Sequence, residues 1–150
     1  MPDLRELYQQ VILDHHKKPR NRRRPGDANK HAEGFNPLCG DKVSVFLRIE
    51  NGVIRDIAFE GSGCAISTAS ASMMTESLKG KTEAEAEGFF ERFHDLVTGK
   101  TPAGSDVSGL GKLAVFAGVR EYPVRVKCAT LAWHTMRAAM EEREETVATE

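Results

Sequence analysis

The chain has 150 residues, which is long enough for one domain with a hydrophobic core and too short for two ordinary domains, so we expect a single domain over residues 1–150. Hydrophobic residues make up 40% of the sequence and charged residues 29%, which are values of a globular protein and exclude a wholly disordered or collagen-like chain. A net charge of -1, the lack of a long apolar run and the lack of a secretion signal predict a cytoplasmic protein with neither nucleic acid nor a membrane as partner.

The first predicted elements are a helix and a basic connection. Apolar residues at helical spacing predict a helix from Asp3 to Lys18, and a proline ends it. His15 and His16 lie in its last turn, where cations favour the helix dipole, and are predicted to be capping or surface residues. Residues 19–36 contain two prolines and two glycines, so they are predicted to form a surface connection with at most one short strand, near His31 to Phe35.

Alternating apolar and polar residues predict a β-hairpin next. Two such runs, residues 43–49 and 53–60, flank the pair Asn51-Gly52, and both residues of that pair tolerate positive φ. An antiparallel hairpin among helices defines an α+β fold. We expect a small antiparallel sheet of about three strands packed against four to five helices.

Three helices are predicted after the hairpin. The first begins at Cys64, behind two glycines, and the second begins with a capping box formed by Thr82 and Glu85. The last one follows Pro123. Residues 100–122 are rich in glycine and are predicted to be a long, mobile or partner-facing loop that contains one short helix.

Charge is concentrated near the two ends of the chain. Six cations lie between Lys17 and Arg24, and the end of the chain from Glu141 is acidic. The basic run has no interleaved aromatic residues, so we interpret it as a docking surface for an acidic protein rather than for nucleic acid. The acidic residues predict a frayed tail over residues 141–150.

Three cysteines carry the predicted chemistry. An odd number of cysteines without an export signal does not indicate a disulfide framework, so these residues are interpreted as thiols that ligate or react. Cys39 and Asp41 are two residues apart, and on an extended backbone their side chains point the same way. Cys64 opens a helix, whose dipole stabilises a thiolate. Cys128 follows two nearby cations, Arg125 and Lys127.

Three thiolates and one carboxylate complete a tetrahedral site for zinc or iron. In this set Asp41 is a hard oxygen donor among sulfurs, so it is the easiest ligand to displace and suits a site that exchanges ligands. His134 is excluded as a further ligand because it lies about 240° around the helix from Cys128. The spacing alone does not exclude that the cysteines are ordinary core residues.

Four motifs resemble one known family. They are Asp14 to Asn21, Cys39-Gly40-Asp41, Gly61 to Glu76 and Arg125 to Trp133, and together they are similar to the U-type iron-sulfur assembly proteins, IscU and SufU. The sequence resembles the SufU branch more closely. Lys127 stands where IscU proteins have a histidine before the last cysteine, and residues 100–122 are similar to the insertion typical of SufU.

This resemblance implies a zinc site formed by Cys39, Asp41, Cys64 and Cys128. It also implies a sulfur acceptor rather than a stand-alone turnover enzyme. Cys39 would take persulfide sulfur from a PLP-dependent cysteine desulfurase similar to SufS, once a desulfurase side chain replaces it on the metal, and Asp41 and Lys127 would tune its release. The expected downstream partners are a cluster scaffold or apo-protein acceptors.

Two alternatives remain open at this stage. The same ligands, above all the three cysteines, could instead hold iron or a nascent [2Fe-2S] cluster on a scaffold. A thiol redox enzyme that uses Cys39 or Cys64 is disfavoured because the sequence has no close pair of cysteines.

Overall fold

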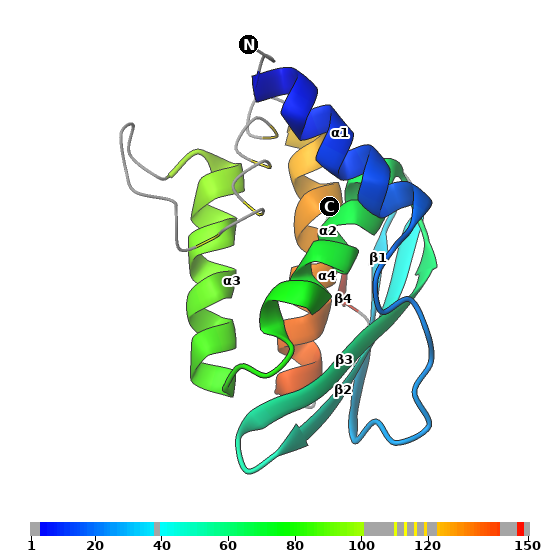
Figure 1. Ribbon diagram of the computed structural model, residues 1–150, viewed down its shortest axis with the longest axis vertical. Coiled ribbons are helices and arrows are strands. Elements are labelled where there is room, and N and C mark those ends of the chain that lie inside the picture. Colours follow the sequence, from blue (N-terminus) through cyan, green and yellow to red (C-terminus); the bar gives the residue numbers. More distant parts are fainter. Residues whose placement is uncertain are drawn as a thin grey trace.

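A computed structural model describes residues 4–37, 40–100, 123–141 and 147–148, together with four single positions, Leu110, Leu113, Phe116 and Val119. The elements, in chain order, are α1 (Leu4–Lys17), β1 (Lys30–Asn36), β2 (Asp41–Glu50), β3 (Val53–Ser62), α2 (Ala65–Leu78), α3 (Glu83–Thr98), α4 (Pro123–Met140) and β4 (Val147–Ala148) (Figure 1). The predicted α+β class is therefore confirmed.

The strands form one sheet in the order β3-β2-β1-β4. The three long strands are antiparallel neighbours, and β2 and β3 are joined by the predicted turn, with φ of 54° at Asn51 and 76° at Gly52. The last pair of β1 and β2 is Asn36 with Asp41, and Ser62 of β3 lies opposite Lys42. The end of β1, the start of β2 and the end of β3 thus meet at one end of the sheet.

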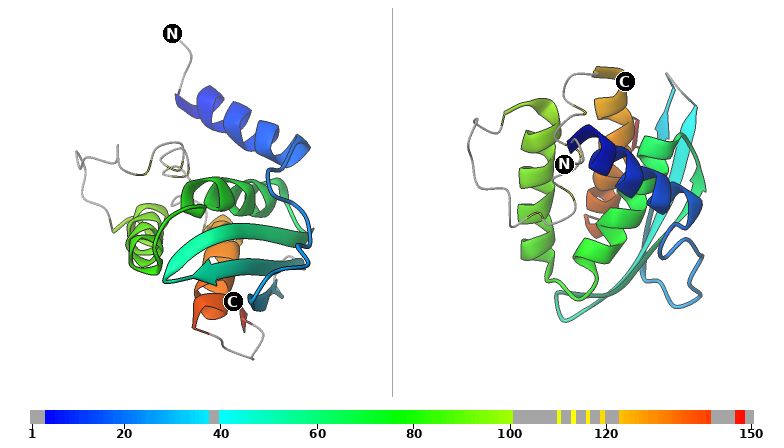
Figure 2. Two further views of the ribbon diagram at one scale, coloured as in Figure 1. Left: turned by 60° about the horizontal axis from the view of Figure 1, so that its bottom comes forward. Right: turned by 45° about the horizontal axis from the view of Figure 1, so that its top comes forward.

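Helices α2 and α4 pack against each other and against the sheet, α1 packs on α2, and α3 packs on α4 (Figures 1 and 2). Buried side chains of β2 and β3, such as Val45, Leu47 and Ile57, form one hydrophobic cluster with Trp133 and Met136 of α4. None of the described helices is both long and apolar enough to cross a membrane.

His15 differs from the prediction of a surface residue. Its exposed fraction is 1%, because α1 lies against α2 and the imidazole is enclosed between the two helices. Its Nδ1 atom lies 2.7 Å from the hydroxyl of Ser72, and its Nε2 atom lies 3.6 Å from the carboxylate of Glu76. The spacing of apolar residues in α1 does not reveal this contact, because the partner comes from a helix 57 residues later.

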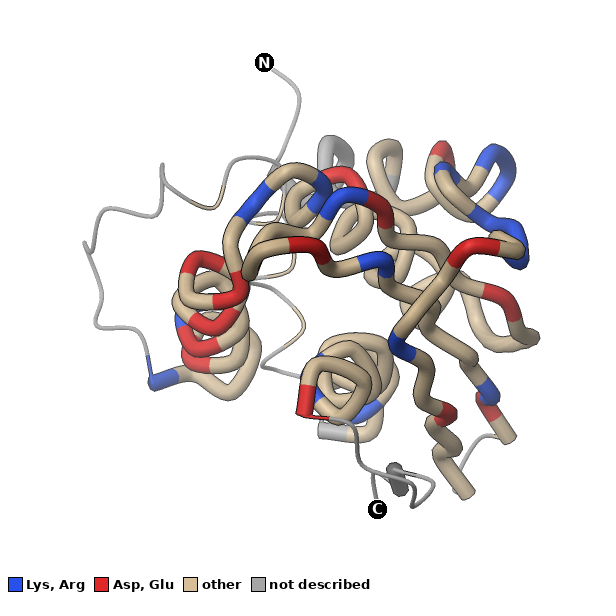
Figure 3. The backbone as a smooth tube through the Cα atoms, turned by 90° about the horizontal axis from the view of Figure 1, so that it is seen from below, with Lys and Arg blue, Asp and Glu red and all other residues tan. Residues whose placement is uncertain are grey.

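The predicted basic docking surface is largely engaged within the chain. Arg22 donates a hydrogen bond to the carbonyl of Gly61, Arg23 pairs with Asp56, and Arg24 lies 3.4 Å from a carboxylate oxygen of Glu60. All three partners belong to β3, because the connection runs beside that strand from Asn21 onward. In contrast, acidic residues gather along α3, as Figure 3 shows.

Two further segments differ in part from their predictions. The described residues of the 110–119 region, Leu110, Leu113, Phe116 and Val119, are at most 5% exposed and belong to the core, so these positions are not partner-facing. The rest of the predicted loop and most of its short helix lie outside the described residues. In the predicted frayed tail, Val147 and Ala148 pair in parallel with Gly34 and Phe35 of β1.

Candidate metal centre

Three of the four predicted ligands come together at the end of the sheet. Asp41 is the first residue of β2, Cys64 is the N-cap of α2, and Cys128 lies in the second turn of α4. One donor atom from each residue lies within 4.8 Å of the others. Asp41 and Cys128 are buried and Cys64 is half-buried, so the group is shielded yet open on one side. Cys39, the fourth predicted ligand, lies outside the described residues.

Two glycines make the close approach of β3 and α2 to β2 possible. A Cβ atom at Gly61, whose φ is +146°, would lie 2.1 Å from the carbonyl oxygen of Lys42. A Cβ atom at Gly63 would lie 2.9 Å from Oδ1 of Asp41. Side chains at these positions would push the start of α2 away from Asp41, so the sequence Gly-Ser-Gly-Cys is what brings Cys64 to the site.

Asp41 is oriented by the backbone of α2. Its Oδ1 atom accepts a hydrogen bond of 2.9 Å from the backbone N–H of Cys64, and its Oδ2 atom lies 3.8 Å from the Cys64 sulfur. Because Oδ1 is held by the helix N-terminus, Oδ2 faces the sulfur of Cys64. A carboxylate held in this way offers one oxygen to a metal ion.

Cys64 is activated by its neighbours. Its sulfur accepts a hydrogen bond from the backbone N–H of Ser67 at 3.4 Å, at the positive end of the α2 dipole. Hydrogen bonding with Cys128, together with this backbone N–H, lowers the pKa of the Cys64 thiol to about 6, although burial and the carboxylate of Asp41 oppose the shift. The lowered pKa favours the thiolate, which is the form that binds a metal.

Arg125 supplies the positive charge at the site. It is exposed in the first turn of α4, and the thiolate charge of Cys64, followed by hydrogen bonding to Cys128, raises the pKa of Arg125. Lys127, the other predicted cation, is half-buried in the same part of α4, and its ammonium group has no ion pair with a described residue. The predicted cation Arg125 thus interacts with the thiols of the site. The predicted role of Lys127, to tune the release of Cys39, stays a prediction.

The structure adds one polar residue that the sequence analysis did not single out. Asn36, at the end of β1, is fully buried, and its side-chain Nδ2 atom lies 3.9 Å from the sulfur of Cys128. In the sequence, the only indication that Asn36 belongs to the site was its position shortly before Cys39-Gly40-Asp41. Its contact with a residue 92 positions later could be found only from the fold.

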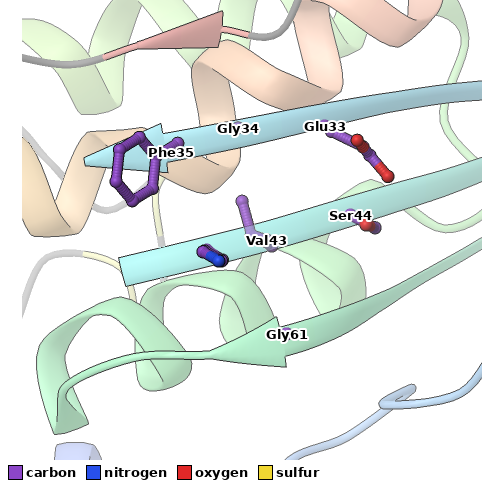
Figure 4. A pocket seen from close by; sticks show the side chains of 7 residues that line it. Glu33, Gly34, Phe35, Val43, Ser44 and Gly61 are labelled. Carbon is purple, nitrogen blue, oxygen red and sulfur yellow. The ribbon is translucent and has the colours of Figure 1, made fainter. Parts of the chain in front are cut away.

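A separate pocket of about 450 Å³ lies beside the candidate centre (Figure 4). It is lined by residues of β1, β2 and β3, among them Glu33, Phe35, Lys42 and Ser44. A Cβ atom on Gly34 would point to α4. Because neighbouring residues of a strand point to opposite faces of the sheet, Glu33 and Phe35 face away from the helices. The pocket contains none of the three donors, although Lys42 directly follows Asp41.

The fold and the site define a class: a small α+β protein with soft sulfur donors and one carboxylate at the end of an antiparallel sheet. The family model of the NifU-like N-terminal domain matches residues 7–129. The chain belongs to this family, and the resemblance to U-type proteins is confirmed.

Individual relatives cover nearly the whole chain. It is 39% identical over 142 residues to the zinc-dependent sulfurtransferase SufU of Bacillus subtilis, a match that covers 95% of each chain. It is 40% identical over 138 residues to the iron-sulfur cluster assembly scaffold protein IscU of Streptococcus pyogenes, over 91% of this chain and 84% of the relative.

Solved structures share the fold. The SufU structure from Fervidobacterium islandicum AW-1 has a TM-score of 0.82 and 37% sequence identity, over 87% of this chain and 94% of that one. A NifU-like N-terminal domain from Brucella abortus has a TM-score of 0.80 at 24% identity, over 92% of this chain and 96% of that one, and supports the fold alone.

Proposed function

We propose that the protein is a zinc-dependent sulfur carrier of iron-sulfur cluster assembly, which accepts persulfide sulfur from a PLP-dependent cysteine desulfurase. The observation that carries this proposal is the convergence of Asp41, Cys64 and Cys128, whose donor atoms lie within 4.8 Å of one another. The relative named as a zinc-dependent sulfurtransferase, 39% identical over 95% of the chain, supports it.

The donor set fits zinc. Two sulfurs and one carboxylate oxygen are present, the Cys64 thiol has a lowered pKa, and Arg125 offsets negative charge. Three protein donors with a fourth position for Cys39 correspond to a tetrahedral site that stays open to exchange. When bound, zinc would keep the ligating thiols unprotonated and protected.

Cys39 is proposed as the fourth ligand and as the sulfur acceptor. It belongs to the connection between Asn36 and Asp41, and both of these residues lie at the centre. A desulfurase side chain would take the place of Cys39 as a zinc ligand. The freed Cys39 thiolate would then attack the terminal sulfur of the desulfurase persulfide. A new sulfur–sulfur bond forms on Cys39, the bond in the persulfide breaks, and the desulfurase cysteine leaves as a thiolate.

The test of this proposal is mass spectrometry of the zinc-loaded protein after incubation with a cysteine desulfurase and cysteine. We expect one added sulfur on Cys39, no added sulfur in Cys39→Ser, and impaired uptake after chelation or in Asp41→Ala. Sulfur on Cys64 or Cys128 would contradict the assignment of the acceptor. Unchanged uptake in Asp41→Ala would remove Asp41 from the mechanism.

A scaffold for a [2Fe-2S] cluster is the second candidate. It is favoured by the relative from Streptococcus pyogenes, which is named a scaffold protein, and thiolates suit such a cluster as well as zinc. Metal analysis and visible absorbance of freshly purified protein separate the two functions, because zinc is colourless and the cluster is not. A coloured protein that contains iron and sulfide and no zinc would favour the scaffold.

A further inference from the structure

The contact between β1 and α4 is unusually close at Gly34. A Cβ atom at this position would lie 2.1 Å from Oγ1 of Thr135 and 3.1 Å from a methyl carbon of Leu131. Only a glycine allows the strand to approach the helix to this distance. The Gly34 contact therefore fixes how far the end of β1 lies from α4.

This contact also determines what lies next to Cys128. Residues of a strand that are two apart share a face, so Asn36 faces α4 as Gly34 does. Cys128, Leu131 and Thr135 are spaced by three and four residues and lie on one face of the helix. The end of the strand and the first turns of the helix thus bring Asn36 to Cys128, with 3.9 Å between Nδ2 and the sulfur.

In the contact between Asn36 and Cys128, the amide is the hydrogen-bond donor and the sulfur is the acceptor. A thiolate that binds a metal only accepts hydrogen bonds, so the NH2 end of the Asn36 amide is the end that can face it favourably. Both side chains are fully buried, and in such surroundings an amide hydrogen bond to a charged acceptor is stronger than in water. The backbone carbonyl of Asn36 accepts a hydrogen bond of 2.8 Å from Gly40, so the same residue also holds the turn before Asp41.

We propose that Asn36 is a positioning residue of the metal centre, which donates an N–H···S hydrogen bond to Cys128 and thereby strengthens metal binding. This inference rests on the proposed function, because it requires that Cys128 is a metal ligand. Residues that hydrogen-bond to a metal ligand without binding the metal themselves typically contribute a factor of about 10–100 to metal affinity.

The experiment compares two substitutions of Asn36 with a control at the same interface. Asn36→Ala removes the N–H donor without adding a charge, and Asn36→Leu keeps a similar volume without any polar atom. Thr135→Val alters the same strand–helix contact without touching the sulfur of Cys128, since the Thr135 hydroxyl donates to the carbonyl of Leu131. Zinc affinity is measured by competition with a chromophoric chelator, and the cobalt(II)-loaded proteins are compared by absorbance.

We expect the zinc dissociation constant to rise about 10–100-fold in both Asn36 variants and to stay within about twofold of the wild type in Thr135→Val. The thiolate-to-cobalt charge-transfer band should move to lower energy in the Asn36 variants, because a thiolate that loses a hydrogen bond donates electrons more readily. A purely structural role would not shift this band while the cobalt site remains four-coordinate. If Asn36→Leu does not fold, Asn36→Ala alone decides the outcome.

Equal affinities and an unshifted band in the Asn36 variants would overturn this inference and leave the proposed function intact. An equal loss of affinity in Thr135→Val would also overturn it, because the effect would then come from packing. A wild-type protein that binds neither zinc nor cobalt would instead overturn the metal centre itself.

Discussion

Asp41 is the residue on which the geometry of the candidate centre depends most. Its Oδ1 atom is held at 2.9 Å by the backbone N–H of Cys64, and its Oδ2 atom faces the Cys64 sulfur. The carboxylate therefore links the first residue of β2 to the first turn of α2. Any change that displaces Oδ1 moves the donor oxygen as well.

Gly63→Ala tests this dependence. The new Cβ atom would lie 2.9 Å from Oδ1 of Asp41, and since the φ of Gly63 is not positive, the effect comes from lack of space rather than from backbone strain. We expect zinc affinity, measured by chelator competition, to fall about tenfold.

The matched control is Gly88→Ala, because a Cβ atom there approaches only the end of Arg92, at 3.8 Å. It should leave zinc affinity unchanged. If Gly63→Ala binds zinc as tightly as this control, the placement of Asp41 does not depend on the space that Gly63 provides.

Single residues also show what the sequence could and could not predict. Asp41, Cys64 and Cys128 were predicted because soft thiols and a carboxylate have recognisable chemistry, and the structure brings them together. Asn36 was not predicted, because a buried asparagine has no signal of its own in a sequence. Its importance comes from a partner on a helix at the other end of the chain.

At the scale of elements, local signals predicted boundaries well. The capping box of Thr82 and Glu85 is present at the start of α3, and Asn51-Gly52 forms the hairpin turn. Both depend on residues that are close in sequence, which is why they could be read directly. The burial of His15 depends on the packing of α1 against α2, which no local pattern specifies.

Gly34→Ala tests the close packing of β1 on α4. Because the Cβ atom would lie 2.1 Å from Oγ1 of Thr135, either the Thr135 side chain must rotate or the strand and the helix must separate. We expect the free energy of unfolding, measured by urea denaturation of the metal-free protein, to fall by about 1–3 kcal/mol.

A second substitution separates this clash from other effects. Thr135→Ala removes the hydroxyl that the new methyl group meets, so Gly34→Ala combined with Thr135→Ala should lose less stability than the sum of the two single variants. Strictly additive losses would show that the two positions do not clash.

At the scale of the whole molecule, the site exists only when three parts of the chain assemble. The donors lie at positions 41, 64 and 128, and they meet because the sheet end, α2 and α4 share one core. The sequence alone could propose this set through chemistry and resemblance. It could not show that Arg125 is the cation that interacts with the thiolates, because neighbouring residues on a helix point in different directions.

The packing of α3 on α4 makes the stability of the molecule depend on pH through His134. Its ring lies against Phe90 and His94 of α3, with ring centroids 5.1 Å and 5.6 Å away, and Arg137 lies one turn further along α4. Burial, followed by the charges of His94 and Arg137, lowers the pKa of His134 below its ordinary value of 6.5. The folded protein therefore resists protonation of this ring.

The sign of the effect follows from this shift. Above pH 6.5 the ring is neutral in both states, and as the pH falls below 6.5 the unfolded chain takes up a proton before the folded chain does. The free energy of unfolding then falls, by at most about 1.4 kcal/mol per pH unit for this one group. The loss ends once the pH is below the pKa of the folded state.

His134→Gln should reduce this loss. We expect urea denaturation of the metal-free protein to show a smaller drop in the free energy of unfolding between about pH 7.5 and pH 5.5 in this variant than in the wild type, because the titrating group is gone. His16→Gln is the matched control for replacing a histidine by glutamine, since His16 is exposed at the end of α1. Equal drops in the wild type and His134→Gln would mean that folding does not lower the pKa of His134.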